Sequence, residues 1–187
     1  MTRFRSMFRI TTACRSAALA LAVAVAGLAI APTASRAADP QLIGTFGAWT
    51  AYTFQEGAGK VCYMASQPRK AEGDYTSRGD IFALVTHRPA EKSNNVISIV
   101  AGYPYKDGSD VSLSVGRTAF TLFTHGDRAW ARTAQIDSQI AEAIRKGSDL
   151  VVKGTSQRGT STIDTYSLSG SSAAYEAISK ACDVKIN

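Results

Sequence analysis

From residue 39 onward, most of the chain consists of short stretches in which apolar or β-branched residues alternate with polar ones. Gly, Pro, Asn or Asp bound these stretches, a combination typical of antiparallel strands joined by turns. The polar segment 67–79 is predicted to be the longest loop, and Gly116 suits a tight hairpin turn because glycine tolerates positive φ. The predicted strands cover residues 46–54, 61–65, 81–86, 96–101, 111–115, 119–124, 128–133, 150–155 and 160–168.

The spacing of apolar residues changes in two places. Between residues 136 and 144 they recur three to four positions apart, which predicts a helix with Asp137 placed to cap its start and Gly147 to end it. Residues 173–181 form one apolar face of a second, C-terminal helix. The predicted fold is mainly β, an antiparallel β-sandwich or small barrel of about eight strands with one short inserted helix and a C-terminal helix.

The first 38 residues have a different character. Four arginines without any acid precede an apolar stretch of 14 residues, 17–30, and Ser35-Arg36-Ala37 then offers the small-x-small pattern that signal peptidases cut. The apolar stretch is shorter than the roughly 20 residues that a membrane-spanning helix needs. A cleavable signal peptide over residues 1–38 and a single domain over 39–187 are therefore predicted, with no stable membrane span in the mature form. An uncleaved anchor is the alternative.

Removing this leader changes the charge of the protein. The whole chain has 21 basic and 15 acidic residues, a net charge of +6, but five of the basic residues lie before residue 39. The remainder carries 16 basic and 15 acidic residues, a net charge of +1. Because a nucleic-acid-binding protein needs a dense basic face, the near-neutral mature chain argues against a nucleic-acid partner.

Two cysteines, Cys62 and Cys182, remain after the leader is removed, since Cys14 leaves with it. In an oxidising compartment such an isolated pair usually forms a disulfide, which is the expectation here. Two separate buried thiols are the alternative. A metal site is disfavoured because the cysteines and the two histidines lack any ligand spacing.

No recognisable catalytic pattern occurs in the chain. His87 and His125 each stand beside a predicted strand end, and neither has a nucleophile or an orienting acid at a spacing that suggests a site. There is no nucleophile elbow, phosphate-binding loop or dinucleotide fingerprint. We therefore expect no catalytic residues, no cofactor and no metal, and a protein that is not an enzyme.

Two short motifs could belong to a contact surface. Arg78-Gly79-Asp80 spells a tripeptide that adhesion proteins present to integrins, although a turn leading into the next strand is the simpler and favoured explanation. Tyr103 and Tyr105 flank a proline at a strand end, where aromatic side chains either form an exposed patch or pack over the sheet edge.

Several segments follow one another in a characteristic order along the mature chain. They are the strand around Trp49 followed by Cys62, then Leu84-Val85-Thr86-His87-Arg88-Pro89, Gly102-Tyr103-Pro104, and the block from Val151 to Ala174 with Lys153-Gly154-Thr155-Ser156, Arg158-Gly159-Thr160 and Asp164-Thr165-Tyr166-Ser167-Leu168-Ser169-Gly170. In this order of features the whole mature chain resembles the invasion associated locus B family of Gram-negative envelope proteins. Relatives often carry further cysteines in mid-domain, where this chain has Thr124-His125-Gly126-Asp127.

The resemblance implies a secreted, β-rich domain that is associated in some relatives with entry into host cells, and it supplies no catalytic residues. The expected function is therefore non-enzymatic contact with an envelope or host protein, in the periplasm or after secretion. The alternative is a soluble periplasmic carrier or inhibitor that holds a small ligand or peptide inside the β-fold. That alternative requires a deep apolar cavity with a few polar groups.

Overall fold

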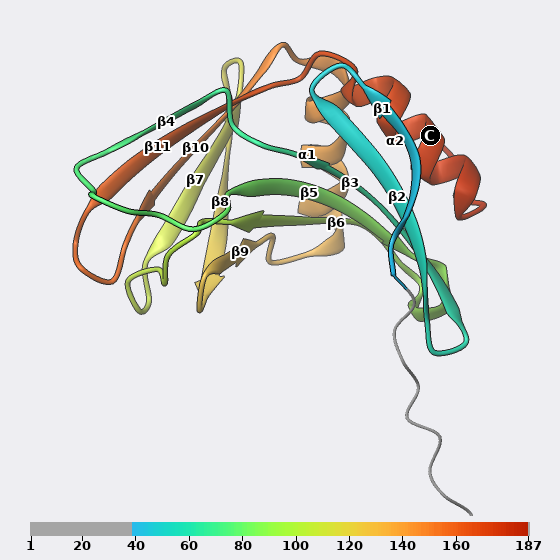
Figure 1. Cartoon of the computed structure of the whole chain (residues 1–187), viewed down its shortest axis with the longest axis horizontal. Helices are drawn as coiled ribbons and strands as arrows, with labels where there is room; N and C mark the ends of the chain where they lie inside the picture. The colour runs from blue at the N-terminus through green and yellow to red at the C-terminus, as the bar shows by residue number, and fades with distance from the viewer. Residues whose placement is uncertain (1–38, 187) are drawn as a thin grey trace, which may run out of the picture. The chain divides into compact units, whose positions relative to one another are not determined.

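The computed structural model describes residues 39–186. The predicted signal peptide, residues 1–38, lies outside the described residues. Within the described part, eleven strands form one antiparallel sheet that is not closed, in the order β1-β2-β3-β5-β6-β9-β8-β7-β10-β11-β4 (Figure 1). The strands are β1 (Gln41–Phe46), β2 (Trp49–Glu56), β3 (Gly59–Ser66), β4 (Lys70–Gly73), β5 (Phe82–Arg88), β6 (Ser93–Val100), β7 (Asp110–Val115), β8 (Thr118–His125), β9 (Arg128–Trp130), β10 (Asp149–Thr155) and β11 (Ser161–Ser167).

The prediction of a mainly β, antiparallel fold with one inserted and one C-terminal helix is confirmed. The structure resolves the choice between sandwich and barrel into a single bent, open sheet. Most predicted strands are present, and Gly116 sits in the β7–β8 turn with φ of 58°. Two strands were not anticipated. β1 lies almost entirely before the predicted strand 46–54, which corresponds to β2, and Gly47 adopts φ of 57° in the turn between them. β4 lies inside the predicted loop 67–79.

Helix α1 (Ala134–Lys146) packs on β6, and helix α2 (Ser171–Ala181) packs along β1, β2 and β3 and also contacts α1 (Figure 1). The predicted cap of α1 is wrong by one turn. Thr133 is the N-cap: its backbone is extended, as is typical of this position, and its Oγ1 accepts the backbone N–H of Ile136 at 3.3 Å. Asp137 instead accepts the backbone N–H of Ile97 in β6 at 2.8 Å and joins the helix to the sheet.

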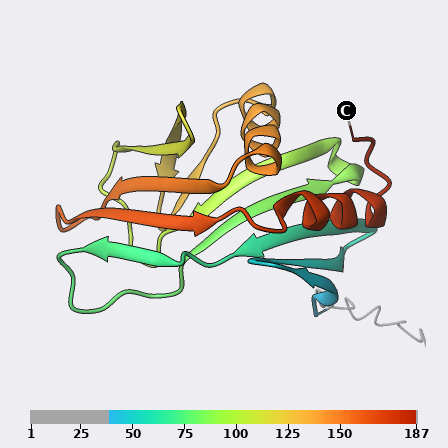
Figure 2. The same ribbon diagram turned by 90° about the horizontal axis from the view of Figure 1, so that it is seen from above.

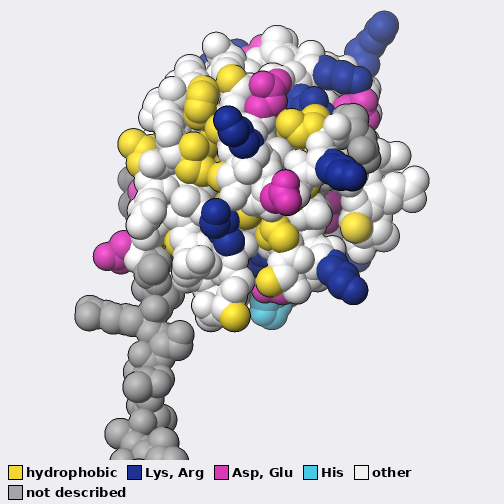
Figure 3. Space-filling model, turned by 90° about the vertical axis from the view of Figure 1, so that its right-hand side faces the viewer, with side chains coloured by type: hydrophobic (Ala, Val, Ile, Leu, Met, Phe, Trp, Pro, Cys, Tyr) yellow, Lys and Arg dark blue, Asp and Glu magenta, His cyan; other side chains and the backbone are white. Residues whose placement is uncertain are grey.

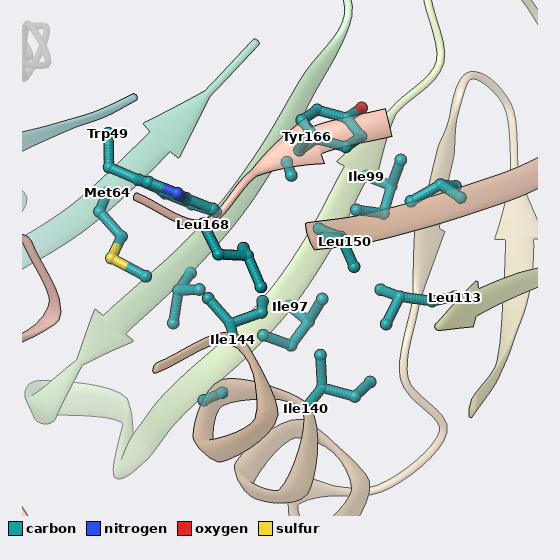
Figure 4. Packing of buried hydrophobic residues seen from close by; sticks show 14 of the residues in the cluster. Trp49, Met64, Ile97, Ile99, Leu113, Ile140, Ile144, Leu150, Tyr166 and Leu168 are labelled. Atoms are coloured by element: carbon teal, nitrogen blue, oxygen red, sulfur yellow. The ribbon is translucent and has the colours of Figure 1, made fainter. Parts of the chain in front are cut away.

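The core lies between the inner face of the bent sheet and the two helices. Residues from both arms of the sheet and from α1 point toward one another (Figure 4). Trp49 is fully buried and its indole N–H donates to the carbonyl of Ser167 at 3.0 Å, so the β2 end of the sheet is fixed to β11. The labelled members of this core are Trp49, Met64, Ile97, Ile99, Leu113, Ile140, Ile144, Leu150, Tyr166 and Leu168.

A disulfide joins Cys62 in β3 to Cys182, the residue that ends α2, across 120 residues of sequence. It attaches the C-terminal helix to the strand that lies beneath it. In the described part of the chain, no helix has the length and apolar character needed to cross a membrane.

Candidate binding site

Three loops at the end of the sheet remote from α2 enclose a cavity of about 490 Å³. They are the segment between β4 and β5, the segment between β6 and β7, and the turn of the β10–β11 hairpin, which Figure 2 shows at the opposite end of the molecule from α2. The β4–β5 and β6–β7 segments contribute the aromatic and apolar groups, Tyr75, Tyr103 and Pro104, whereas the hairpin turn contributes polar side chains. The cavity therefore gathers residues that are up to 88 positions apart, from Asp74 to Thr162.

A buried ion pair forms the floor of this cavity. The Arg78 guanidinium donates to both carboxylate oxygens of Asp164, with two distances of 2.6 Å, and its Nε donates to the carbonyl of Ala101 at 2.5 Å. The side chains of Arg78 and Asp164 are only 4% and 3% exposed. Burial opposes the charge on Arg78, but the hydrogen bonds and attraction from Asp164 outweigh it, so the pKa of Arg78 lies above its ordinary value.

Aromatic rings surround this ion pair. The Arg78 guanidinium carbon lies 4.8 Å from the ring centre of Tyr103 and 5.5 Å from that of Tyr75, within the range of cation–π attraction. Tyr103 shares a hydrogen bond of 2.5 Å with the Thr162 hydroxyl. Tyr105 packs against Tyr103 with ring centres 5.3 Å apart and is 4% exposed. Burial raises the pKa values of both Tyr103 and Tyr105, so both hydroxyls stay protonated at neutral pH.

Two glycines let the loops of the cavity approach closely. Gly79 donates its backbone N–H to the carbonyl of Gly102 at 2.9 Å. Gly102 has φ of 71°, and a Cβ on it would collide with the Gly79 backbone. In the Arg78-Gly79-Asp80 tripeptide, therefore, Arg78 is directed into the protein and Gly79 is packed against backbone, whereas Asp80 is exposed. The Arg78 charge is not available to an external receptor in this conformation.

The structure thus brings together four of the five residues singled out from the sequence, Arg78, Gly79, Tyr103 and Tyr105, and leaves Asp80 outside the cluster. Asp164 was not among the residues predicted from the sequence. A signal was present, because Thr162, Asp164 and Tyr166 occupy alternate, core-facing positions of β11, and an acid at such a position needs a buried hydrogen-bond donor or cation as its partner.

His87 lies on the inner face of β5 and is fully buried. Its Nδ1 accepts the backbone N–H of Asn95 at 3.1 Å, so the neutral ring carries its proton on Nε2 and donates it to the Ser179 hydroxyl, also at 3.1 Å. A general base would need the reverse tautomer to take a proton from serine. Burial lowers the pKa of His87 to about 4. His125 is exposed at the end of β8.

A second feature lies on the outer side of the sheet, opposite the core. Tyr52 of β2 and Tyr63 of β3 stack with ring centres 5.1 Å apart, and Leu42 of β1, which pairs with Tyr52, is 62% exposed. A groove of about 530 Å³ continues across β2, β3 and β5. We call this surface the aromatic face; it comprises Leu42, Tyr52, Phe54, Tyr63, Phe82 and Leu84.

Charged residues do not gather by sign on the side of the molecule that Figure 3 presents. Lys and Arg side chains are interspersed there with Asp and Glu among hydrophobic groups. The ion pairs at the surface, such as Arg69 with Asp149, likewise join opposite charges. Within the described residues, no group of three or more His, Cys, Asp or Glu side chains is placed to hold a metal ion.

Comparison with known families assigns the chain. The model of the Invasion associated locus B (IalB) protein family matches residues 49–179. The chain belongs to the IalB family. The resemblance predicted from sequence is therefore confirmed. No match was found among curated proteins or among solved structures.

The IalB match includes the whole lining of the cavity and most of the aromatic face, and it ends just before Cys182. Disulfides such as the one that Cys182 forms with Cys62 are formed and retained mainly in oxidising compartments. Together, the disulfide and IalB membership suggest an exported protein.

Proposed function

We propose that this IalB protein is a non-enzymatic, exported protein of the bacterial envelope that acts by binding another protein through its aromatic face. The observation that carries the proposal is the exposed Leu42 beside the stacked pair of Tyr52 and Tyr63, on the side of the sheet opposite the core. The partner expected from this chemistry is a folded protein that presents apolar side chains, with polar groups at the edge to pair with the tyrosine hydroxyls.

The composition of the aromatic face supports a contact role. A sheet with one face on the core usually presents polar side chains to water on the other. Here the outward positions of β2 and β5 include Tyr52, Phe54, Phe82 and Leu84. Tyrosine and phenylalanine are enriched in protein interfaces because they bury much area for little loss of side-chain entropy.

The histidines support the non-enzymatic part of the proposal. His87 donates to Ser179 rather than accepting from it, and both groups are fully buried. His125 stands exposed on a different strand. Neither arrangement provides a base within reach of an accessible nucleophile.

The carrier alternative fits the described structure less well. A ligand held inside the β-fold needs an apolar space between the arms of the sheet. That region is occupied by packed side chains of the core, including Trp49, Ile97, Leu113 and Tyr166 (Figure 4).

The cellular location is part of the same proposal. Cleavage of residues 1–38 would release the mature domain into the periplasm, where Cys62 and Cys182 meet an oxidant. Where the protein passes beyond the cell surface, the partner is a host-cell protein. Fractionation combined with protease treatment of intact cells distinguishes the two locations, since only a surface-exposed protein is digested.

Site-specific photocrosslinking in intact producing cells tests the contact. A photoreactive phenylalanine analogue in place of Tyr63 is expected to give one adduct of defined mass. The matched control carries the same analogue at Thr121, an exposed outward position of β8. The Leu42→Lys substitution is expected to abolish the Tyr63 adduct without lowering the melting temperature, because the Leu42 side chain is mostly in water.

Two results would overturn the proposed contact. One is the absence of any adduct from position 63 in folded, disulfide-bonded protein. The other is an identical set of adducts from positions 63 and 121, which would indicate random encounters.

A further inference from the structure

The cavity beside Arg78 is lined by polar groups that take no part in the contact proposed for the aromatic face. Its wall carries the hydroxyls of Thr76, Ser77 and Thr160 and the amide of Gln157. These groups donate and accept hydrogen bonds without carrying charge. Tyr75 and Tyr103 add aromatic rings to the lining, each with one face toward the Arg78 guanidinium. The wall can therefore bind both hydroxyl groups and polarised C–H groups of one small ligand.

The charges around the cavity cancel. Arg78 is neutralised by Asp164 in the floor. Asp74 and Arg158 stand at the rim, and neither side chain has an ion-pair or hydrogen-bond partner among the described residues. One free carboxylate and one free guanidinium together favour a ligand without net charge. They disfavour a polyanion such as a phosphate ester, and they also disfavour a simple cation.

The site is also held rigid before any ligand arrives. The turn of the β10–β11 hairpin is fixed to the β6–β7 segment by the Gln157 N–H, which donates to the carbonyl of Pro104 at 2.8 Å. Within the turn, the Ser156 hydroxyl accepts the Thr160 N–H at 3.1 Å. The Thr162 hydroxyl is positioned by Tyr103. Pre-ordered polar groups bind with less loss of entropy than mobile ones.

We infer that the cavity formed by Asp74, Tyr103, Gln157, Arg158 and Thr160 is a binding site for a neutral carbohydrate. A sugar ring offers vicinal hydroxyls, which a carboxylate, a guanidinium or an amide can engage in pairs. It also offers a C–H face that an electron-rich aromatic ring attracts. The volume of about 490 Å³ accommodates one or two sugar rings and falls within the usual range for small-ligand sites.

Such a sugar has two sources, the bacterium's own envelope glycans and the glycans of a host-cell surface. Saturation-transfer NMR with the oxidised mature protein separates them, using di-N-acetylchitobiose as the wall-type probe and lactose as the host-type probe. Binding is expected for at least one probe, and the stronger signal identifies the source. Titration of that probe then gives its Kd.

Substitutions at the rim locate the binding. Asp74→Ala and Arg158→Ala are each expected to weaken binding of the preferred sugar by about tenfold, as loss of a hydrogen bond to a charged group would. Both side chains are exposed and make no contact that the fold needs, so the melting temperature is expected to stay unchanged. The matched control is Arg117→Ala, an equally exposed arginine in the β7–β8 turn.

The inference is overturned if neither sugar binds to folded protein. It is also overturned if Asp74→Ala and Arg158→Ala bind as well as the unaltered protein, or if Arg117→Ala weakens binding equally. Tight binding of an acidic or basic peptide in preference to both sugars would assign the cavity to a protein partner and overturn it as well. Crosslinking from position 63 is independent of these outcomes.

Discussion

Arg78 donates two hydrogen bonds to the Asp164 carboxylate, and both side chains are almost completely buried. Replacing Asp164 by Asn keeps the shape of the side chain but leaves the Arg78 charge buried without its partner. The expected loss is about 3–5 kcal/mol in the free energy of unfolding, measured with urea. Asp149→Asn is the matched control, because the Arg69–Asp149 pair is about half exposed. Its loss should stay below about 1 kcal/mol. Equal losses would contradict the buried role of Arg78.

Two further residues make the free energy of unfolding depend on pH with opposite signs. The pKa of His87 is lowered by burial from 6.5 to about 4, so the unfolded chain takes up a proton first and stability is lost as pH falls from 6.5 toward 4. The pKa of Asp137 is raised by burial from 3.8 to about 6, against the hydrogen bond from Ile97. The folded form therefore keeps its proton longer, and stability is lost as pH rises from 3.8 through 6.

Each pKa shift changes the free energy of unfolding by about 3 kcal/mol across its pH range. Because the two changes have opposite signs, they nearly cancel between pH 4 and 6. Asp137→Asn is expected to expose the His87 effect, so that the free energy of unfolding falls steadily as the buffer is acidified from pH 6.5 to 4. The unaltered protein should show a much weaker slope over this interval. Urea titrations at half-unit pH steps measure both slopes. A steep slope in the unaltered protein that Asp137→Asn does not change would contradict the balance.

At the scale of the elements, the loops of the cavity depend on one close backbone approach. Gly102 and Gly108 both have positive φ, 71° and 68°, but only at Gly102 would a Cβ meet neighbouring atoms, those of the Gly79 and Asp80 backbone. Gly108→Ala is expected to cost about 1 kcal/mol from backbone conformation alone. Gly102→Ala should cost clearly more, because the β4–β5 segment must also move. Melting temperatures of the two variants measure the difference, and similar values would contradict the close approach.

Some strands could be predicted from the sequence and others could not. Strands with strict alternation, such as β7, were predicted almost to the residue because alternate positions face the core. β4 was missed because all four of its residues are exposed and it is ordered only by pairing with β11, about 90 positions later. The cavity itself was not predicted: Arg78 and Tyr103, which line it, were singled out only as possible contact residues. Its position beside Asp164 and the β10–β11 turn depends on long-range strand pairing that local patterns do not encode.

The open sheet has two ends, and the disulfide cross-links only the one that contains β3, where it attaches the end of α2. Cys182→Ser releases α2 from β3. We expect it to lower the free energy of unfolding by about 2–5 kcal/mol under oxidising conditions, because the unfolded chain loses a cross-link that spans 120 residues. Under reducing conditions the variant and the unaltered protein should melt alike. An equal destabilisation in both conditions would mean that the Cys182 side chain acts through packing alone.

The distance along the chain between the two bonded sulfurs has a consequence for biogenesis. Cys62 and Cys182 are 120 residues apart in the sequence. In an exported chain that leaves the cytoplasm N-terminus first, the earlier thiol reaches the oxidant while most of its partner segment is still inside. Bond closure therefore has to wait until Cys182 has crossed as well. A product that stops before Cys182 would carry the Cys62 thiol unpaired and reactive.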